Sequence, residues 1–267
     1  MNKTIFITGA SSGLGKETAK LFALKGWTVI AAMRHPEKET ELSLLPNIHL
    51  LKLDLCHPEQ LTEIASAAEK ISTVDVLLNN AAYGLMGALE GSTDEQLAQQ
   101  INTNLLGTIL ISKAFLPYFR NRKNGTIITI TSSTVNVPYP FVAAYAATKA
   151  ALKTWTEAMS YELSQFGIHI KTVVPAYMQT NFGANAQIVS HPAYQEIFSQ
   201  YITQMKTDSG VNRDLPEDIA PIIYKAATDN NKRLHYTAGN LAIKEYEWLQ
   251  DEQIEIVMEK MRKRFFG

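Results

Sequence analysis

Tyr145 and Lys149 are two polar side chains in an alanine-rich stretch, AAYAATKAAL, that runs from Ala143 to Leu152. The composition is typical of a helix, and residues four apart lie on one helix face about one turn from each other. An ammonium group beside a tyrosine favours the phenolate and lowers a pKa that is otherwise about 10. The pair therefore predicts a proton-transfer centre. The alternative is the polar surface edge of a packing helix.

A second candidate is the glycine-rich segment TGASSGLG, residues 8–15, which follows a β-branched run and opens a helical pattern. Gly9, Gly13 and Gly15 allow a tight turn and a close approach of backbone amides to a pyrophosphate. The N-terminus of the following helix adds unpaired N–H groups and partial positive charge. The segment predicts a dinucleotide site, with a ligand-free tight turn as the alternative. Its spacing is GxxxGxG, not the commoner GxGxxG.

The residues after the second and third predicted strands bear on the choice of dinucleotide. An acidic residue after the second strand would bind the ribose 2′-hydroxyl. Here the strand ends AAMR, and no carboxylate comes before Glu37. Arg34 is suited to a 2′-phosphate. We therefore expect NADP(H), with NAD(H) second. Asp54 ends the third strand and is expected either to accept from the adenine amino group or to cap the next helix.

These residues require a scaffold of alternating strands and helices. The predicted strands are apolar on nearly every residue, which indicates a parallel sheet buried on both faces. We expect one α/β domain over residues 1–267, a Rossmann-type doubly wound sheet of about seven strands with helices on both faces. The expected strands are 3–8, 27–32, 48–55, 74–81, 125–133, 168–175 and 235–238. The expected helices are 14–25, 58–71, 94–119, 143–165, 216–228 and one C-terminal helix.

Residues 178–215 interrupt this rhythm with an aromatic-rich insertion after the sixth strand. Doubly wound sheets bind ligands beyond the carboxyl ends of their strands. We therefore expect this segment to be a lid over the substrate. The alternative is a helix pair that packs on a neighbouring subunit.

Six motifs occur in order along the chain: TGASSGLG, NNAA (79–82), NTNLLG (102–107), TSS (131–133), YAATK (145–149) and PAYMQT (175–180). This set resembles the classical short-chain dehydrogenases/reductases over nearly the whole chain. The resemblance implies an NAD(P)-dependent oxidoreductase acting on CH–OH groups. It also implies a catalytic tetrad of Asn104, Ser132, Tyr145 and Lys149, with Ser132 preferred to Ser133 because it stands thirteen residues before Tyr145.

The family roles are carried onto this chain as expectations. Ser132 is expected to donate to the substrate oxygen, and Lys149 to hold the nicotinamide ribose. Asn104 is expected to hold a water that links Lys149 to solvent, or else to be a satisfied buried amide. The expected cofactor-binding residues are Thr8, Gly9, Ser11, Ser12, Gly13, Leu14, Gly15, Arg34, Asp54, Leu55, Asn80, Ala81, Tyr145, Lys149, Pro175 and Thr180. The chain departs from the family's NNAG and PG patterns at Ala82 and Ala176.

The substrate is expected to be an apolar carbonyl compound or alcohol, because the predicted wall segments before Tyr145 lack arginine and lysine. That wall comprises Tyr83, Leu85, Met86, Val135, Val137, Tyr139, Phe141, Val142, Phe182, Tyr194, Phe198 and Met205. Two rival functions stay open. One is a non-catalytic NADP-binding redox sensor, disfavoured because Tyr145 and Lys149 are both present. The other is an epimerase or dehydratase of the extended fold, disfavoured by the chain length and the glycine spacing.

The composition of the chain bears on its cellular compartment and on its binding partners. Net charge is −1 over 267 residues, so no overall field favours nucleic acid or an acidic membrane. Cys56 is the only cysteine, which fits a reducing compartment. No signal peptide or membrane-length apolar run is seen, and no HExxH or Cys/His cluster suggests a metal. We expect a cytoplasmic homodimer or homotetramer with an interface on helices 94–119 and 143–165.

Overall fold

Seven parallel strands form the central sheet of the computed structural model, which describes residues 2–180, 182–183, 185–211 and 214–267. The order of the strands reverses beside the first strand, between β1 and β4. The strand order is β3 (Ile48–Lys52), β2 (Thr28–Met33), β1 (Thr4–Thr8), β4 (Val76–Asn79), β6 (Gly125–Ile130), β7 (Ile168–Pro175) and β9 (His235–Ala238).

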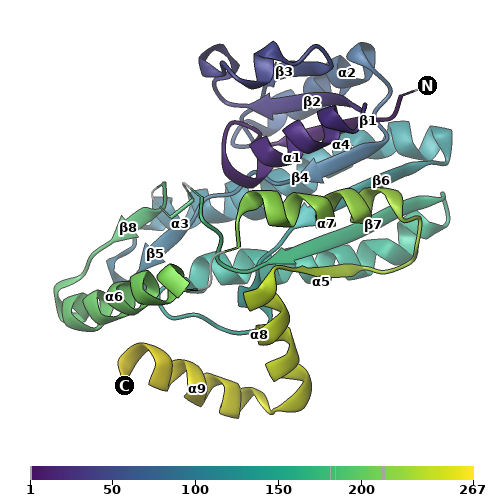
Figure 1. Cartoon of the computed structure of the whole chain (residues 1–267). Coiled ribbons are helices and arrows are strands. Elements are labelled where there is room, and N and C mark those ends of the chain that lie inside the picture. Colours follow the sequence, from purple (N-terminus) through teal and green to yellow (C-terminus); the bar gives the residue numbers. More distant parts are fainter. Residues whose placement is uncertain (1, 181, 184, 212–213) are drawn as a thin grey trace.

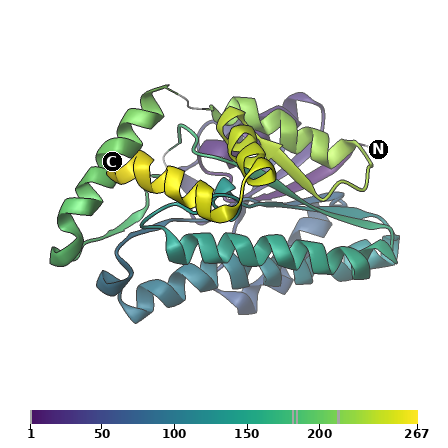
Figure 2. The ribbon, with the colours of Figure 1, turned by 90° about the horizontal axis from the view of Figure 1, so that it is seen from below.

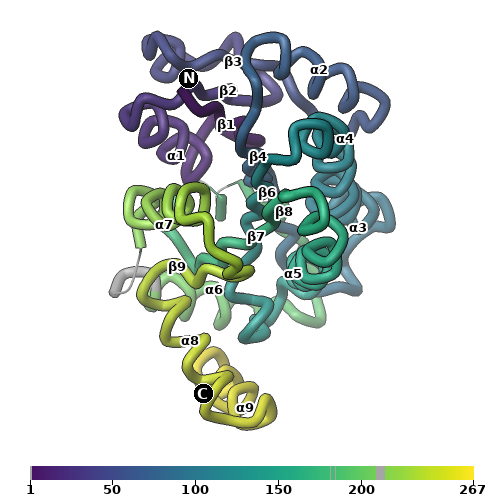
Figure 3. Tube along the Cα trace, turned by 90° about the vertical axis from the view of Figure 1, so that its right-hand side faces the viewer, coloured from purple at the N-terminus to yellow at the C-terminus, as the bar shows by residue number. Residues whose placement is uncertain are grey.

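Helices cover both faces of this sheet, as Figure 3 shows in a view roughly along the strands. One face carries α1 (Gly13–Leu24) and α7 (Pro216–Thr228), and the other carries α2 (Leu61–Ile71), α4 (Gly107–Arg122) and α5 (Ala143–Ser164). Successive residues of β1 point to opposite faces: Ile5 and Ile7 pack with α1 and α7, whereas Phe6 meets Phe115 of α4 at 5.0 Å between ring centroids. Burial of both faces explains the unbroken apolar runs, and the predicted doubly wound fold is confirmed.

The predicted helix 94–119 is interrupted. The structure has α3 (Asp94–Ile101), a π-helical turn over Asn102–Leu106 and then α4. Gly107 follows the turn at a close approach, because a Cβ there would stand 2.8 Å from Cβ of Leu55. A π-turn inside a helix changes which side chains share a face, and such turns are frequent at functional sites.

The expected single C-terminal helix is two helices, α8 (Asn240–Asp251) and α9 (Ile254–Phe266), because Glu252 is extended between them. Figure 2 shows α9 beside α6 (Gln195–Val211) at one end of the molecule. Helices α6 and α9 form an apolar cluster together with the loop before α5. The cluster contains Val137, Tyr201, Val257, Met261 and Phe265.

The insertion after β7 lies beyond the carboxyl ends of the main strands (Figure 1). It contains β8 (Gln187–Val189), which pairs in parallel with β5 (Leu85–Gly87), and α6. Gly87 is required there, because its φ is +142° and a Cβ would stand 2.1 Å from the carbonyl oxygen of Val189. Within the expected lid, 178–215, Asn181, Ala184, Asn212 and Arg213 lie outside the described residues. Through the described part of the chain, no helix is long and apolar enough to cross a bilayer.

Candidate active site

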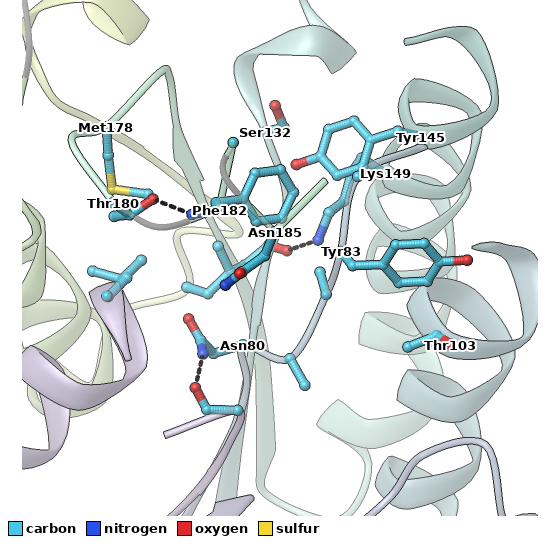
Figure 4. Close-up of a pocket in the computed structure, with 18 of the residues that line it drawn as sticks. Asn80, Tyr83, Thr103, Ser132, Tyr145, Lys149, Met178, Thr180, Phe182 and Asn185 are labelled. Atoms are coloured by element: carbon cyan, nitrogen blue, oxygen red, sulfur yellow. Dashed lines mark hydrogen bonds between the residues drawn. The ribbon is translucent and has the colours of Figure 1, made fainter. Parts of the chain in front are cut away.

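A cavity of about 720 Å³ opens at the carboxyl ends of the strands, at the reversal point between β1 and β4. This is where doubly wound sheets place their ligands. Figure 4 shows part of its lining, with Asn80 at one end and Ser132, Tyr145 and Lys149 at the other. The glycine loop, the NNAA segment, the Ser132 turn and the insertion all contribute residues.

The glycine loop has the geometry that a pyrophosphate needs. Gly9 has φ +69°, and a Cβ there would stand 2.8 Å from Cα of Ala81. At Gly15 a Cβ would stand 2.4 Å from the carbonyl oxygen of Gly9. The Ser12 side chain does not cap α1, so the backbone N–H groups of the first helical turn have no hydrogen bond to it. The residues present therefore fit a bound dinucleotide phosphate.

Two predicted cofactor residues support this loop from behind and do not line the cavity, namely Thr8 and Gly15. Thr8 Oγ1 accepts hydrogen bonds from the backbone N–H groups of Asn80 and Ala81, each at 3.0 Å. Asn80 Nδ2 donates to the carbonyl oxygens of Thr8 and Gly9, also at 3.0 Å. The end of β4 thereby fixes the conformation of the glycine loop.

Arg34, Asp54 and Leu55, which are expected to contact the adenosine, line the cavity. Arg34 is exposed and has no ion pair with any carboxylate of the described residues. Asp54 Oδ1 accepts from the backbone N–H of Cys56 at 3.0 Å, so it closes a short turn and also lines the cavity. The alternative expectation, that Asp54 caps the next helix, is wrong, because the N-cap of the 3-10 turn Pro58–Gln60 is His57. The position of Asp54 in the cavity wall is compatible with the expected contact to the adenine amino group.

The structure brings Ser132, Tyr145 and Lys149 together at the other end (Figure 4). Ser132 acts to lower the pKa of the Tyr145 hydroxyl, and its Oγ accepts from the backbone N–H of Thr134 at 3.3 Å. Lys149 Nζ lies 5.7 Å from the centroid of the Tyr145 ring and donates to the carbonyl oxygen of Ile130 at 2.8 Å. Tyr145 is half-buried and Lys149 is buried.

The pKa of Tyr145 differs from the expectation. Burial raises it to about 12, against a smaller lowering by the Ser132 hydroxyl. Burial also lowers the pKa of Lys149 to about 8. The prediction that Lys149 lowers the Tyr145 pKa is wrong for this state, because the ammonium bonds Ile130 and both groups are desolvated. The Tyr145 side chain is therefore a protonated phenol at neutral pH and not a phenolate.

Asn104 does not reach the cavity wall. It is fully buried in the π-turn, where its Oδ1 accepts from the backbone N–H of Tyr83 at 3.1 Å and its Nδ2 donates to the Tyr83 carbonyl oxygen at 2.8 Å. Its own carbonyl oxygen accepts from Thr108 Oγ1 at 2.9 Å. This arrangement matches the second expectation for Asn104, that of a buried amide with hydrogen-bond partners inside the protein. Its side chain fixes Tyr83, which does line the cavity.

The remaining predicted cofactor residues line the cavity: Gly9, Ser11, Ser12, Gly13, Leu14, Asn80, Ala81, Pro175 and Thr180. Thr180 stands next to the glycine loop, since a Cβ on Gly13 would be 3.3 Å from its side chain. Ala82 and Ala176, the two departures from the family pattern, are also in the wall.

The substrate wall was predicted only in part. Tyr83, Met86, Tyr139, Val142, Phe182 and Met205 line the cavity, and the ring of Phe182 lies 5.6 Å from that of Tyr145. Leu85, Val135, Val137, Phe141, Tyr194 and Phe198 are not among the lining residues, because several of them point into the apolar cluster under α9. Sequence reasoning missed Gln99, Thr103, Asn185, Gln187 and Tyr201. Gln99 and Thr103 are four residues apart, a spacing that places both on one helix face and could have indicated a shared position in the cavity wall. The sequence around Asn185 gave no comparable indication.

The sequence model described as short chain dehydrogenase matches residues 3–188. The chain belongs to the short-chain dehydrogenase family. The predicted family and oxidoreductase class are thereby confirmed. The chain is 30% identical to the 3-ketodihydrosphingosine reductase of Bacteroides thetaiotaomicron over 265 residues, which cover 95% of this chain and 96% of the relative.

Two solved structures are similar over most of the chain. A short-chain dehydrogenase from Streptomyces avermitilis superposes with a TM-score of 0.86 at 28% identity, covering 98% of this chain and 96% of the other. ElxO with NADP bound gives a TM-score of 0.75 at 28% identity, covering 91% of this chain and all of the other. The family match ends inside β8, so α6 and the C-terminal helices lie beyond it.

Proposed function

We propose that this short-chain dehydrogenase is an NADP(H)-dependent oxidoreductase that interconverts an apolar carbonyl compound and its alcohol. The observation that carries the proposal is the grouping of Ser132, Tyr145 and Lys149 in the same cavity as the glycine loop. When bound there, the nicotinamide supplies or accepts the hydride. The chain's own residues bind, orient and protonate the substrate.

The proposed proton step is based on the positions of Ser132, Tyr145 and Lys149 in the cavity. Ser132 donates to the substrate oxygen and stabilises the negative charge that develops on it. Tyr145 then gives its hydroxyl proton to that oxygen during carbonyl reduction. The Tyr145 pKa of about 12 keeps the phenol protonated at neutral pH. Lys149, buried beneath the ring, supplies positive charge where the phenolate forms.

Preference for NADP(H) is supported by Arg34. Its guanidinium lines the cavity without a carboxylate partner in the described chain, so it is available to a 2′-phosphate. Glu37, the next carboxylate, is bonded to His35 at 3.1 Å instead. The NADP complex of ElxO, a related protein, is consistent with this choice.

An apolar substrate is supported by the wall next to Tyr145. Phe182, Met86 and Met205 come from the insertion and from β5, and no lysine or arginine other than Arg34 and Lys149 lines the described cavity. The Bacteroides relative is named 3-ketodihydrosphingosine reductase, which is consistent with reduction of a ketone. The redox-sensor alternative has no supporting observation among the described residues, whereas the position of Ser132, Tyr145 and Lys149 in one cavity supports catalysis.

The test is NADPH and NADH oxidation with a panel of apolar ketones, apolar aldehydes and charged polyols, followed at 340 nm. We expect turnover of apolar carbonyl compounds with NADPH. Turnover of charged polyols alone would reject the substrate class, and binding of NADPH without any turnover would favour the sensor. Arg34→Ala should weaken NADPH binding about 10-fold or more and leave NADH binding little changed, since a charge-assisted bond is worth about 1.5–3 kcal/mol. The exposed Lys38, outside the cavity, gives the matched control Lys38→Ala.

A homodimer or homotetramer in the cytoplasm is also part of this proposal. The predicted interface helices expose Ile101, Leu106 and Tyr161, the last with 80% of its surface accessible. Light scattering on the purified protein tests the assembly, and a monomer with unchanged activity would reject it.

A further inference from the structure

Glu245 is a fully buried carboxyl group that the proposed reaction does not use. It lies on α8, a helix beyond the end of the family match, and none of its surface is accessible. Burial raises its pKa, and the neighbouring hydroxyls and Arg264 only partly oppose that. Burying a carboxyl group costs folding free energy, because desolvation disfavours its charged form.

The partners of Glu245 belong to the active-site loop. The Tyr139 hydroxyl donates a hydrogen bond to Glu245 Oε1, and Tyr139 lines the cavity. The Ser133 hydroxyl also acts on the carboxyl and lowers its pKa. Ser133 directly follows Ser132 in the chain, and α8 packs against the 3-10 turn Ser133–Val135. One side chain thus contacts the turn that presents Ser132 and a wall residue of the substrate cavity.

The positive charge nearest Glu245 is that of Arg264, which also pairs with a second carboxylate. Arg264 Nη1 lies 3.8 Å from Glu245 Oε1, but Arg264 Nε donates to Asp208 Oδ2 of α6 at 2.8 Å. The Arg264 guanidinium also lies 5.9 Å from the centroid of the Tyr139 ring. The groups facing Glu245 are therefore Tyr139, Ser133 and Arg264, with Asp208 behind the arginine. The carboxyl is therefore oriented by the hydrogen bond from the Tyr139 hydroxyl, and its ion pair with Arg264 is long.

We propose that Glu245 is a positioning residue that holds the Ser132 turn and the Tyr139 ring in their working places. Ser132 can polarise a substrate oxygen only if its hydroxyl is fixed relative to Tyr145, and small displacements of such donors reduce rates strongly. Glu245 supplies that restraint from the C-terminal region, through the hydrogen bond from Tyr139 and the packing of α8 on the turn at Ser133–Val135. Where it concerns catalysis, this inference rests on the proposed reductase function.

Three variants test it. Glu245→Leu removes the hydrogen bonds while keeping an apolar side chain of similar length, and Glu245→Gln keeps an acceptor for Tyr139 and a polar atom for Ser133. Glu247→Leu is the matched control, because Glu247 is exposed on the same helix. Supporting-group losses of this kind cost about 10- to 100-fold. We expect kcat/KM to fall by that factor in Glu245→Leu, to stay within about threefold in Glu245→Gln, and NADPH affinity to be unchanged in both.

A double variant separates positioning from general destabilisation. If Glu245 acts through Ser132, Glu245→Leu should have little further effect on activity in a Ser132→Ala background, since coupled residues are not additive. Full additivity of the two losses would overturn the proposal, as would wild-type kcat/KM in Glu245→Leu. Equal losses of activity in Glu245→Leu and Glu247→Leu would also overturn it, because the effect would then be one of the helix alone.

Hydrogen exchange on the protein without substrate gives a readout independent of turnover. We expect faster amide exchange over residues 132–139 in Glu245→Leu than in wild type or Glu245→Gln. Unchanged protection of that segment in Glu245→Leu would overturn the positioning role. If the wild type reduces no carbonyl compound but the exchange differs as expected, the reductase function fails and the restraint on the turn stands.

Discussion

The ammonium nitrogen of Lys149 donates a hydrogen bond to the carbonyl oxygen of Ile130, 2.8 Å away at the end of β6. Only 3% of the Lys149 surface is accessible, and burial lowers its pKa from 10.5 to about 8. The fold therefore holds a desolvated cation beside the ring of Tyr145, the proposed proton donor. Under the proposed function, this destabilising charge stands where the phenolate of Tyr145 would form.

The first prediction concerns the effect of that charge on stability. The pKa of Lys149 is lower in the folded state, so between about pH 8 and 10.5 the unfolded chain binds more protons and stability rises with pH. Relative to Lys149→Met, the wild type should gain up to about 3 kcal/mol in free energy of unfolding between pH 7 and 10.5. Urea denaturation of both proteins across this range checks it. A pH-independent difference would contradict the lowered pKa.

The second prediction concerns Tyr145→Phe. The ring stays in place against Phe182, and only the proton donor is removed. Carbonyl reduction should fall about 100- to 10,000-fold, the usual contribution of a general acid. NADPH affinity, measured by fluorescence titration, should remain near the wild-type value. Near-normal turnover would remove Tyr145 from the mechanism.

The third prediction concerns the close contact between Gly15 and Gly9. A Cβ at Gly15 would stand 2.4 Å from the Gly9 carbonyl oxygen and 2.5 Å from Asn80 Nδ2, so α1 or the end of β4 must move. Gly15→Ala should lower the free energy of unfolding by about 1–3 kcal/mol, the typical cost of overpacking. It should also weaken NADPH binding, because the glycine loop is displaced. Denaturant unfolding and a fluorescence titration test both effects, and wild-type values in both would show that the contact relaxes freely.

The sheet and the glycine loop could be predicted because their signals are local. Strands such as β1 are apolar on consecutive residues, which only a doubly covered sheet accommodates, and Gly9, Gly13 and Gly15 meet a backbone demand that few other residues satisfy. The grouping of Ser132, Tyr145 and Lys149 followed from ordered motifs at the ends of neighbouring elements.

Contacts between distant segments could not be predicted. β5 and β8 are three residues each and a hundred positions apart, so neither carries a strand signal of its own. Asn104 gives no sign in the sequence that its amide is used by Tyr83, nor Glu245 that its carboxyl is buried against Tyr139. In each case the decisive partner is set by tertiary packing rather than by spacing along the chain.

The last prediction concerns Lys171 and Asp229 at the far end of the sheet. Lys171 is buried on β7, and its Nζ donates to Asp229 Oδ1 and to the Ala226 carbonyl oxygen, each at 2.8 Å. Burial acts to raise the Asp229 pKa, but hydrogen bonds from Lys171 and Tyr236 outweigh it, so the pKa is lowered. Asp229→Ala would leave the ammonium unpaired and should cost about 3–5 kcal/mol of unfolding free energy. Urea denaturation at pH 7 measures this loss.

The control for that pair is Lys171→Met/Asp229→Ala, which removes both charges and should recover most of the loss, because the penalty comes from the unpaired cation. The lowered Asp229 pKa also sets the direction of the pH effect: its stabilisation is present above the ordinary carboxyl pKa and is lost as pH falls through the lower folded value. The acid-induced loss should therefore be smaller in the double variant than in wild type. An Asp229→Ala protein as stable as wild type would show that the ammonium is solvated and that the buried pair contributes nothing.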